Sequence, residues 1–93
     1  MDFIELFNGV VKLAKPSSPE RSYAKSTSDE LADLNLDSLD TILLAMYLGE
    51  IYGVEEDVMR EMEADTVADL QAFLNTHKAR TPTDVKAELE RVK

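Results

Sequence analysis

The chain has 93 residues and a net charge of −9; 44% of its residues are hydrophobic, 31% are charged and none is cysteine. This length and composition predict one globular domain with a small core, and they exclude a deep catalytic cleft, a disulfide framework and a thiolate zinc site. The charge disfavours nucleic acid and anionic membranes as partners. Without a membrane-spanning apolar run or a signal peptide, we expect a cytoplasmic protein.

The first predicted helix spans residues 2–15, where apolar residues recur at helical spacing until Pro16 ends it. Gly9 lies inside this helix, where it costs about 1 kcal/mol relative to alanine, and we expect it to allow a close helix crossing. Residues 16–28 are rich in proline, serine and basic residues and predict a long loop, of the kind that is often functional in a compact domain. Residues 28–34 predict a helical turn that brings the end of this loop to the next segment.

The second predicted helix spans residues 38–52, after Asp37 and before Gly53. Asp37 is a preferred N-cap residue, so Ser38 becomes the first helical residue, with its hydroxyl beside backbone N–H groups that lack a partner within the helix. A phosphate on that hydroxyl would meet the positive end of the helix dipole. Apolar residues occur nearly all round this helix, as in helices central to a domain. We expect its core side to consist of Thr41, Ile42, Ala45, Leu48 and Tyr52, and its opposite side of Asp40, Leu43, Met46, Tyr47 and Glu50.

Three further helices follow. Residues 56–62 predict a short third helix, and residues 67–78, capped by Asp65 or Thr66, predict a fourth. An additional C-terminal helix is predicted to start at Pro82, because proline suits the first helical position. The expected inward residues are Val58, Met59 and Met62, then Val67, Leu70, Phe73 and Leu74, then Val85, Leu89 and Val92. We therefore divide the chain into a helical domain, 1–78, and a C-terminal helical extension or tail, 79–93.

The serine at the head of the second helix lacks what a catalytic nucleophile needs. Activating Ser38 requires a base within hydrogen-bond reach, and the chain has one histidine, His77, and no cysteine. We therefore expect a protein that is not an enzyme. Two interpretations of Ser38 stay open on local physics: it caps a helix, or another enzyme modifies it.

Three residues before the second helix imitate the opening of an EF-hand calcium loop: Asp33, Asn35 and Asp37. The remaining positions do not match a calcium-binding loop, because Ser38 stands where glycine is needed and Leu44 where the bidentate glutamate belongs. We therefore predict no metal site.

A longer pattern surrounds Ser38. Residues 31–41 read LADLNLDSLDT, and three shorter patterns follow them: GVE at 53–55, TVADL at 66–70 and FL at 73–74. In these patterns the chain resembles the acyl carrier protein family, in which a D-S-L core carries the prosthetic-group serine. Their spacing matches that family without an insertion or deletion. The resemblance covers the middle half of the chain.

The resemblance implies an all-α fold, an antiparallel four-helix bundle with a long first loop and a short third helix, to which this chain adds the C-terminal helix. Ser38 would carry 4′-phosphopantetheine, transferred from coenzyme A by a phosphopantetheinyl transferase. The thiol of that arm would hold acyl groups as thioesters for the enzymes of fatty-acid, polyketide or related secondary-metabolite biosynthesis.

Acidic residues concentrate around Ser38, since Arg60 is the one basic residue among many acids between residues 28 and 77. This distribution favours loading and processing enzymes with basic docking surfaces as partners, and we expect the protein to be a monomer. The docking residues that we expect on and before the second helix are Asp37, Leu39, Asp40, Leu43, Met46 and Glu50.

The chain departs from the family pattern at several positions. Leu43 and Gly49 stand where fatty-acid carriers usually have glutamate, and Glu56 and Asp57 stand where isoleucine and proline are common. These departures favour a dedicated polyketide or other secondary-metabolite pathway. Two alternatives stay open: an aminoacyl or peptidyl carrier of a nonribosomal pathway that uses the same serine, and a non-covalent acidic helical adaptor with no prosthetic group.

Overall fold

Helices dominate the computed structural model, which describes residues 2–17, 23–34 and 36–92. Their bounds are α1 (Phe3–Ala14), the 3-10 turn η2 (Leu31–Leu34), α2 (Ser38–Tyr52), α3 (Glu56–Arg60), α4 (Val67–His77) and α5 (Val85–Val92). Within the described ranges there is no strand, only an isolated bridge between Glu30 and Thr66, so the predicted all-α class is confirmed. Residues 18–22 of the predicted loop, and Asn35, lie outside the described residues.

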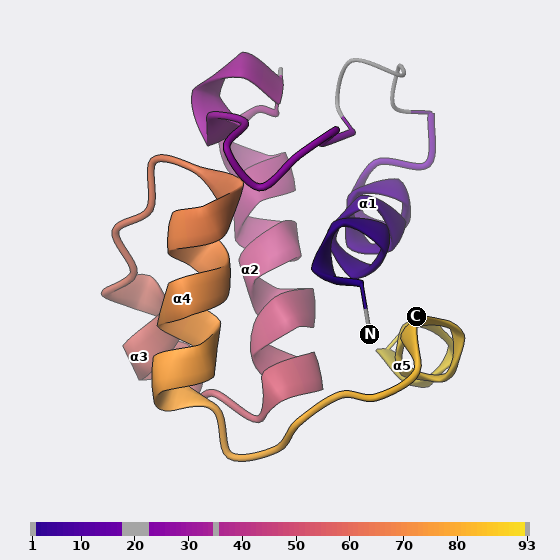
Figure 1. The fold of residues 1–93 in the computed structure, drawn as a ribbon, viewed down its shortest axis with the longest axis vertical. Helices are drawn as coiled ribbons and strands as arrows, with labels where there is room; N and C mark the ends of the chain where they lie inside the picture. Colours follow the sequence, from indigo (N-terminus) through magenta and orange to yellow (C-terminus); the bar gives the residue numbers. More distant parts are fainter. Residues whose placement is uncertain (1, 18–22, 35, 93) are drawn as a thin grey trace.

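The second helix is the centre of the fold, because α1, α3, α4 and α5 all contact it. Figure 1 shows α2 and α4 running side by side along the long axis, with α1 and α5 seen nearly end-on beside α2. The described part of the protein measures 31 × 26 × 22 Å along its principal axes. A helix in contact with four others needs apolar side chains on more than one side, which agrees with its sequence.

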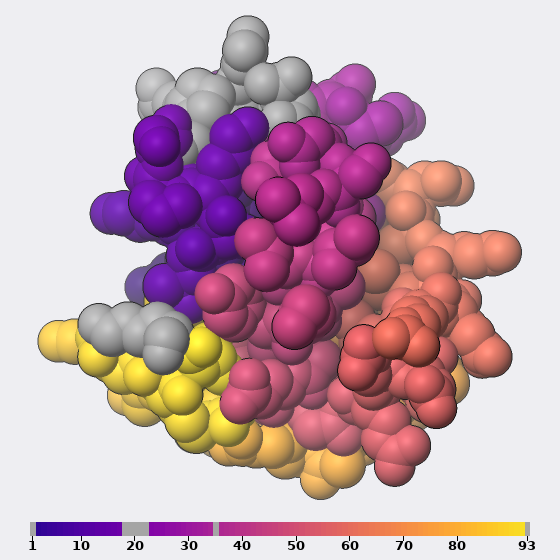
Figure 2. All heavy atoms as spheres, turned by 180° about the vertical axis from the view of Figure 1, so that it is seen from behind, coloured from indigo at the N-terminus to yellow at the C-terminus, as the bar shows by residue number. Residues whose placement is uncertain are grey.

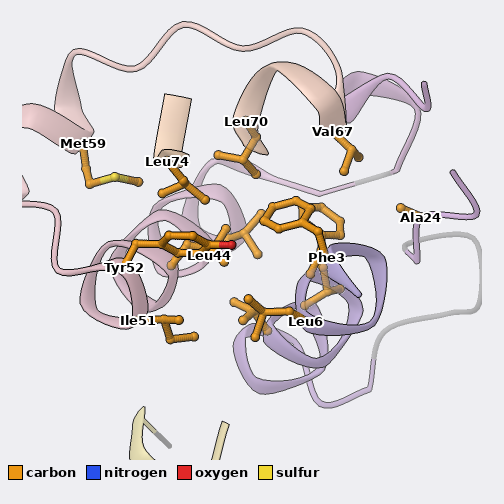
Figure 3. Close-up of a cluster of buried hydrophobic side chains, with 14 of the residues drawn as sticks. Phe3, Leu6, Ala24, Leu44, Ile51, Tyr52, Met59, Val67, Leu70 and Leu74 are labelled. Carbon is orange, nitrogen blue, oxygen red and sulfur yellow. The ribbon is translucent and has the colours of Figure 1, made fainter. Parts of the chain in front are cut away.

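The core forms where α1, α2 and α4 meet. Figure 3 shows Leu44 and Tyr52 of α2 in one cluster with Leu70 of α4 and Phe3 of α1. The rings of Phe3 and Tyr52 meet edge to face, with their centroids 6.4 Å apart, and burial raises the pKa of the Tyr52 hydroxyl. Burying one such apolar side chain fully contributes about 1.5–3 kcal/mol. The largest fully buried side chains are Phe7, Leu6, Leu48, Ile51, Leu70, Leu74, Val10, Val11 and Val67.

The side of α2 that faces the core differs in part from the prediction. Thr41 and Ile42 were expected inside, yet both are exposed, and Ile42 keeps 56% of its surface accessible. Asp40 was expected outside and is buried. The buried apolar residues of this helix are Leu44, Leu48, Ile51 and Tyr52. Because the helix is apolar nearly all round, its own sequence does not determine which face is buried. The contacts with α1 and α4 determine the buried face.

The ends of the later helices follow local capping. The Thr66 hydroxyl accepts the Asp69 N–H at 3.1 Å and starts α4, as one of the two predicted caps. The predicted start of α5 at Pro82 is wrong, because the Asp84 carboxylate accepts the N–H of Lys86 at 3.0 Å, and α5 begins after this cap. The short third helix ends at Arg60 rather than at residue 62.

The C-terminal helix packs on α1 at the glycine that was expected to allow a close crossing. A methyl group on Gly9 would clash with Cδ1 of Leu89 and lie 3.2 Å from Cδ2, so this close approach is confirmed. The buried carboxylate of Glu88 lies 3.4 Å from the guanidinium of Arg80 and 3.1 Å from that of Arg91. Arg91 also donates to the Glu50 carbonyl of α2 at 3.2 Å.

Candidate functional site

The candidate site is the N-terminal end of α2, which a reciprocal cap defines. The Asp37 carboxylate accepts the Asp40 N–H at 2.8 Å, and the Asp40 carboxylate accepts the Asp37 N–H at 3.2 Å. The Thr41 hydroxyl adds a 2.9 Å hydrogen bond to the Asp37 carbonyl. This capping box satisfies two of the four N–H groups that a helix start leaves without partners. It also orients the first turn around Ser38.

Ser38 is the first residue of α2, and it is exposed. In the described part of the chain, the N–H groups of Ser38 and Leu39 donate to no protein acceptor. An oxyanion attached to the Ser38 hydroxyl could therefore accept from free backbone donors at the positive end of the helix. The prediction that Ser38 heads the helix next to unpartnered N–H groups is confirmed.

The start of α4 has the same kind of cap but is closed by the preceding loop. The N–H of Val67 donates to the Asp29 carbonyl at 3.0 Å, and that of Ala68 donates to the Thr27 carbonyl at 2.7 Å. Leu31 returns a 2.8 Å hydrogen bond to the Asp65 carbonyl. The two helix starts therefore differ at their first two helical residues: the N–H groups of Val67 and Ala68 are occupied, whereas those of Ser38 and Leu39 meet no acceptor among the residues that the structure describes.

Backbone donors near the contact between the loop and the start of α4 lower the pKa of two carboxyl groups. The N–H groups of Lys25 and Ser26 donate to Asp29, and those of Thr66 and Asp65 donate to Asp69, so both carboxyl groups have a pKa below the ordinary value of 3.8. Both are ionised at neutral pH and hold the loop and the α4 cap in place. These contacts fix the segment that leads through η2 to Ser38.

Asp40 pairs with the lysine that caps the C-terminal end of α1. The Lys15 ammonium lies 3.4 Å from Asp40 Oδ2, and the Asp40 side chain is only 10% exposed. The cation compensates the charge of a buried carboxylate that also accepts the neutral N–H of Asp37. The Asp40 carboxylate is therefore turned toward α1 and the helix cap rather than toward solvent.

An exposed apolar stripe runs along α2 from the residue after Ser38. Its three side chains, Leu39, Ile42 and Met46, are 64%, 56% and 57% exposed, the large apolar residues most open to solvent in the described ranges. Their spacing of three and four residues places them on one face of the helix. Figure 2 shows that α2 is uncovered on this side of the molecule, between α1 and α3.

The expected docking residues differ in their exposure. Asp37, Leu39, Met46 and Glu50 are exposed, Leu43 is half-buried, and Asp40 is buried. Ile42 belongs to the exposed stripe although it was expected in the core. The i, i+3 relation between Leu39 and Ile42 was the signal that could have indicated this.

The other candidate groups do not gather into a reactive site. His77 ends α4 and packs against Phe73, with ring centroids 4.5 Å apart. Across the described ranges, no three acidic or histidine side chains are placed to hold a metal ion, and no helix is long and apolar enough to cross a membrane. Two open hollows, of about 420 and 510 Å³, are both lined in part by Tyr23 and Lys25.

Comparison with protein-family models, with curated proteins and with solved structures yields no match to this chain.

Proposed function

We propose that the protein is an acyl carrier, in which Ser38 bears a 4′-phosphopantetheine arm that presents acyl thioesters to partner enzymes. The observation that carries the proposal is the exposed Ser38 at the first position of α2, beside two N–H groups that donate to no acceptor among the described residues. The D-S-L core and the spaced patterns of the sequence support the same assignment.

The chemistry that the arm supplies when bound is a thiol that forms thioesters. Transfer from coenzyme A joins phosphorus to Ser38 Oγ and releases the nucleotide half of coenzyme A. A phosphopantetheinyl transferase provides the catalytic groups for this step, because the carboxylates of Asp37 and Asp40 beside the serine are engaged in the capping box and the single histidine, His77, ends α4. The chain's own contribution is to expose the hydroxyl and to offer backbone donors for the phosphate.

The fold that we propose for this role equates α1, α2, α3 and α4 with the four helices of the carrier bundle, and α5 with an addition. The order of the elements supports this assignment: a loop precedes α2, and a short α3 lies between α2 and α4. In this reading α5 is the addition that supports α1 and the C-terminal end of α2.

We propose that partner enzymes dock on the stripe of Leu39, Ile42 and Met46, rimmed by Asp37 and Glu50. An apolar centre with a charged rim is the usual anatomy of a transient interface. The acidic surroundings favour basic partner surfaces, including those of the phosphopantetheinyl transferase and of acyl-loading and acyl-processing enzymes. Asp40 is left out of this surface because it is buried and paired.

The experiment is intact-mass measurement after incubation with coenzyme A and a broad-range phosphopantetheinyl transferase. We expect one phosphopantetheine increment per chain, absent from Ser38→Ala and retained in Ser28→Ala, which removes another exposed serine. A wild-type chain that gains no mass while a control carrier is loaded would contradict the proposal.

A second candidate is a non-covalent helical adaptor. The exposed stripe on α2 favours it, because that surface could bind a partner whether or not Ser38 is modified. Absence of loading, together with binding that is lost on changing Ile42 or Met46 to aspartate, would favour the adaptor. An aminoacyl or peptidyl carrier would be loaded on the same serine, and a panel of loading enzymes would distinguish it.

A further inference from the structure

We infer that Lys15 is a positioning residue for the modification of Ser38: by neutralising Asp40, it keeps the start of α2 receptive to an anionic phosphate. The inference rests on the proposed function, because it concerns the serine that would be modified. Its basis is the ion pair between the end of α1 and the first turn of α2.

The geometry ties Lys15 to the cap itself. Asp40 Oδ2, which lies 3.4 Å from the Lys15 ammonium, is the same oxygen that accepts the Asp37 N–H. Lys15 follows directly after α1, where its backbone N–H donates to the Val11 carbonyl at 2.8 Å. A cation there is also favourable to the C-terminal end of the α1 dipole. One ammonium therefore joins the last turn of α1 to the first turn of α2.

The electrostatic problem at this helix start is the presence of two carboxylates around the modified residue. A helix N-terminus carries about half a positive charge, which one uncompensated carboxylate would cancel. The Asp37 carboxylate engages the Asp40 N–H at 2.8 Å, and the Asp40 carboxylate is compensated by Lys15. Because Asp40 is buried, solvent and salt would screen its charge only weakly if the lysine were absent. Lys15 therefore lowers the repulsion that a phosphate on Ser38 would meet.

The test compares Lys15→Met with Lys12→Met. Lys12 is an exposed residue of α1, so both variants change the net charge equally and only the first breaks the ion pair. We expect Lys15→Met to lower the rate of phosphopantetheine loading at subsaturating protein about two- to fivefold, the size of a helix-terminus charge effect, and Lys15→Arg to restore it. Lys12→Met should load at the wild-type rate.

A spectroscopic readout separates positioning from general loss of structure. We expect the amide protons of Ser38 and Leu39 to shift downfield on loading, as they donate to the phosphate, and to shift less in Lys15→Met. Asp40→Asn keeps an acceptor for the cap and removes the charge, so it should load at least as fast as wild type. If Lys15→Met does not fold, the double variant Lys15→Met/Asp40→Asn replaces it and should load at close to the wild-type rate.

The outcomes distinguish this inference from the proposed function. Loading of wild type, with Lys15→Met equal to Lys12→Met in rate and in amide shifts, would overturn the role of Lys15 and leave the carrier intact. The role of Lys15 would also be overturned, and the carrier left intact, if Asp40→Asn slowed phosphopantetheine loading as much as Lys15→Met does. A wild-type chain that is not loaded at all would overturn both.

Discussion

Replacing Gly9 with alanine tests the contact between α1 and α5. In the middle of a helix this change stabilises by about 1 kcal/mol through backbone propensity alone. Here the new methyl would clash with Cδ1 of Leu89 and lie 3.2 Å from Cδ2 and 3.3 Å from Cγ. Leu89 must then leave its rotamer, at about 0.5–1.5 kcal/mol. We therefore expect Gly9→Ala to leave the free energy of unfolding close to the wild-type value or below it.

The double variant isolates the contact. A Leu89→Ala background removes the three atoms nearest to the new methyl, so Gly9→Ala should recover its full stabilisation of about 1 kcal/mol there. Urea unfolding of the four proteins, followed by circular dichroism, measures the difference as an interaction energy of about 1 kcal/mol. Equal stabilisation by Gly9→Ala in both backgrounds would refute the packing of α5 over Gly9.

Three further changes probe the loop, the α4 cap and the exposed stripe. Asn8→Ala removes the hydrogen bonds of 2.9 and 2.7 Å that join the Asn8 side chain to the backbone of Ala24 in the loop. Urea unfolding should show that the free energy of unfolding falls by about 1–2 kcal/mol. An unchanged unfolding midpoint would contradict the claim that these bonds stabilise the loop. Asp69 has a lowered pKa in the folded protein, so its contribution to stability is present above the ordinary value of 3.8 and is lost as the pH falls through the lower folded value. Asp69→Asn should therefore flatten the acid loss of stability in urea midpoints measured from neutral to low pH, and an unchanged slope would contradict it. Ile42→Ala should change the free energy of unfolding by less than about 0.5 kcal/mol, whereas Leu48→Ala should lower it by about 2–5 kcal/mol. Similar losses for the two variants would contradict the assignment of Leu48 to the buried side of α2 and of Ile42 to its exposed side.

The starts of α2 and α4 were predictable because their signals are local. Asp37 and Thr66 each precede an apolar run, each has an aspartate three residues later, and each forms the capping box that this spacing favours. Gly53 ends α2 with a left-handed backbone at a φ of 68°, which glycine adopts without steric cost. The position of Ser38 at the head of a helix follows from these signals alone.

Most features that depend on tertiary contacts were not predictable, although the close approach at Gly9 was. The core face of α2 is selected by its neighbours, since Ile42 and Leu44 look equally suited to burial in the sequence. Asp40 is buried because Lys15, far away in the sequence, reaches it. The start of α5 was misplaced because Asp84 caps it more effectively than Pro82 could begin it. The division of the chain at residue 78 stays a prediction.

The most direct test of the account is fragmentation mass spectrometry of the loaded protein, which locates the added group on the chain. The account predicts that every fragment carrying the phosphopantetheine mass contains Ser38, and that Ser26 and Ser28 remain unmodified. A loaded chain whose added mass resides on any other residue would contradict the central claim, which is that the open start of α2 is the attachment site.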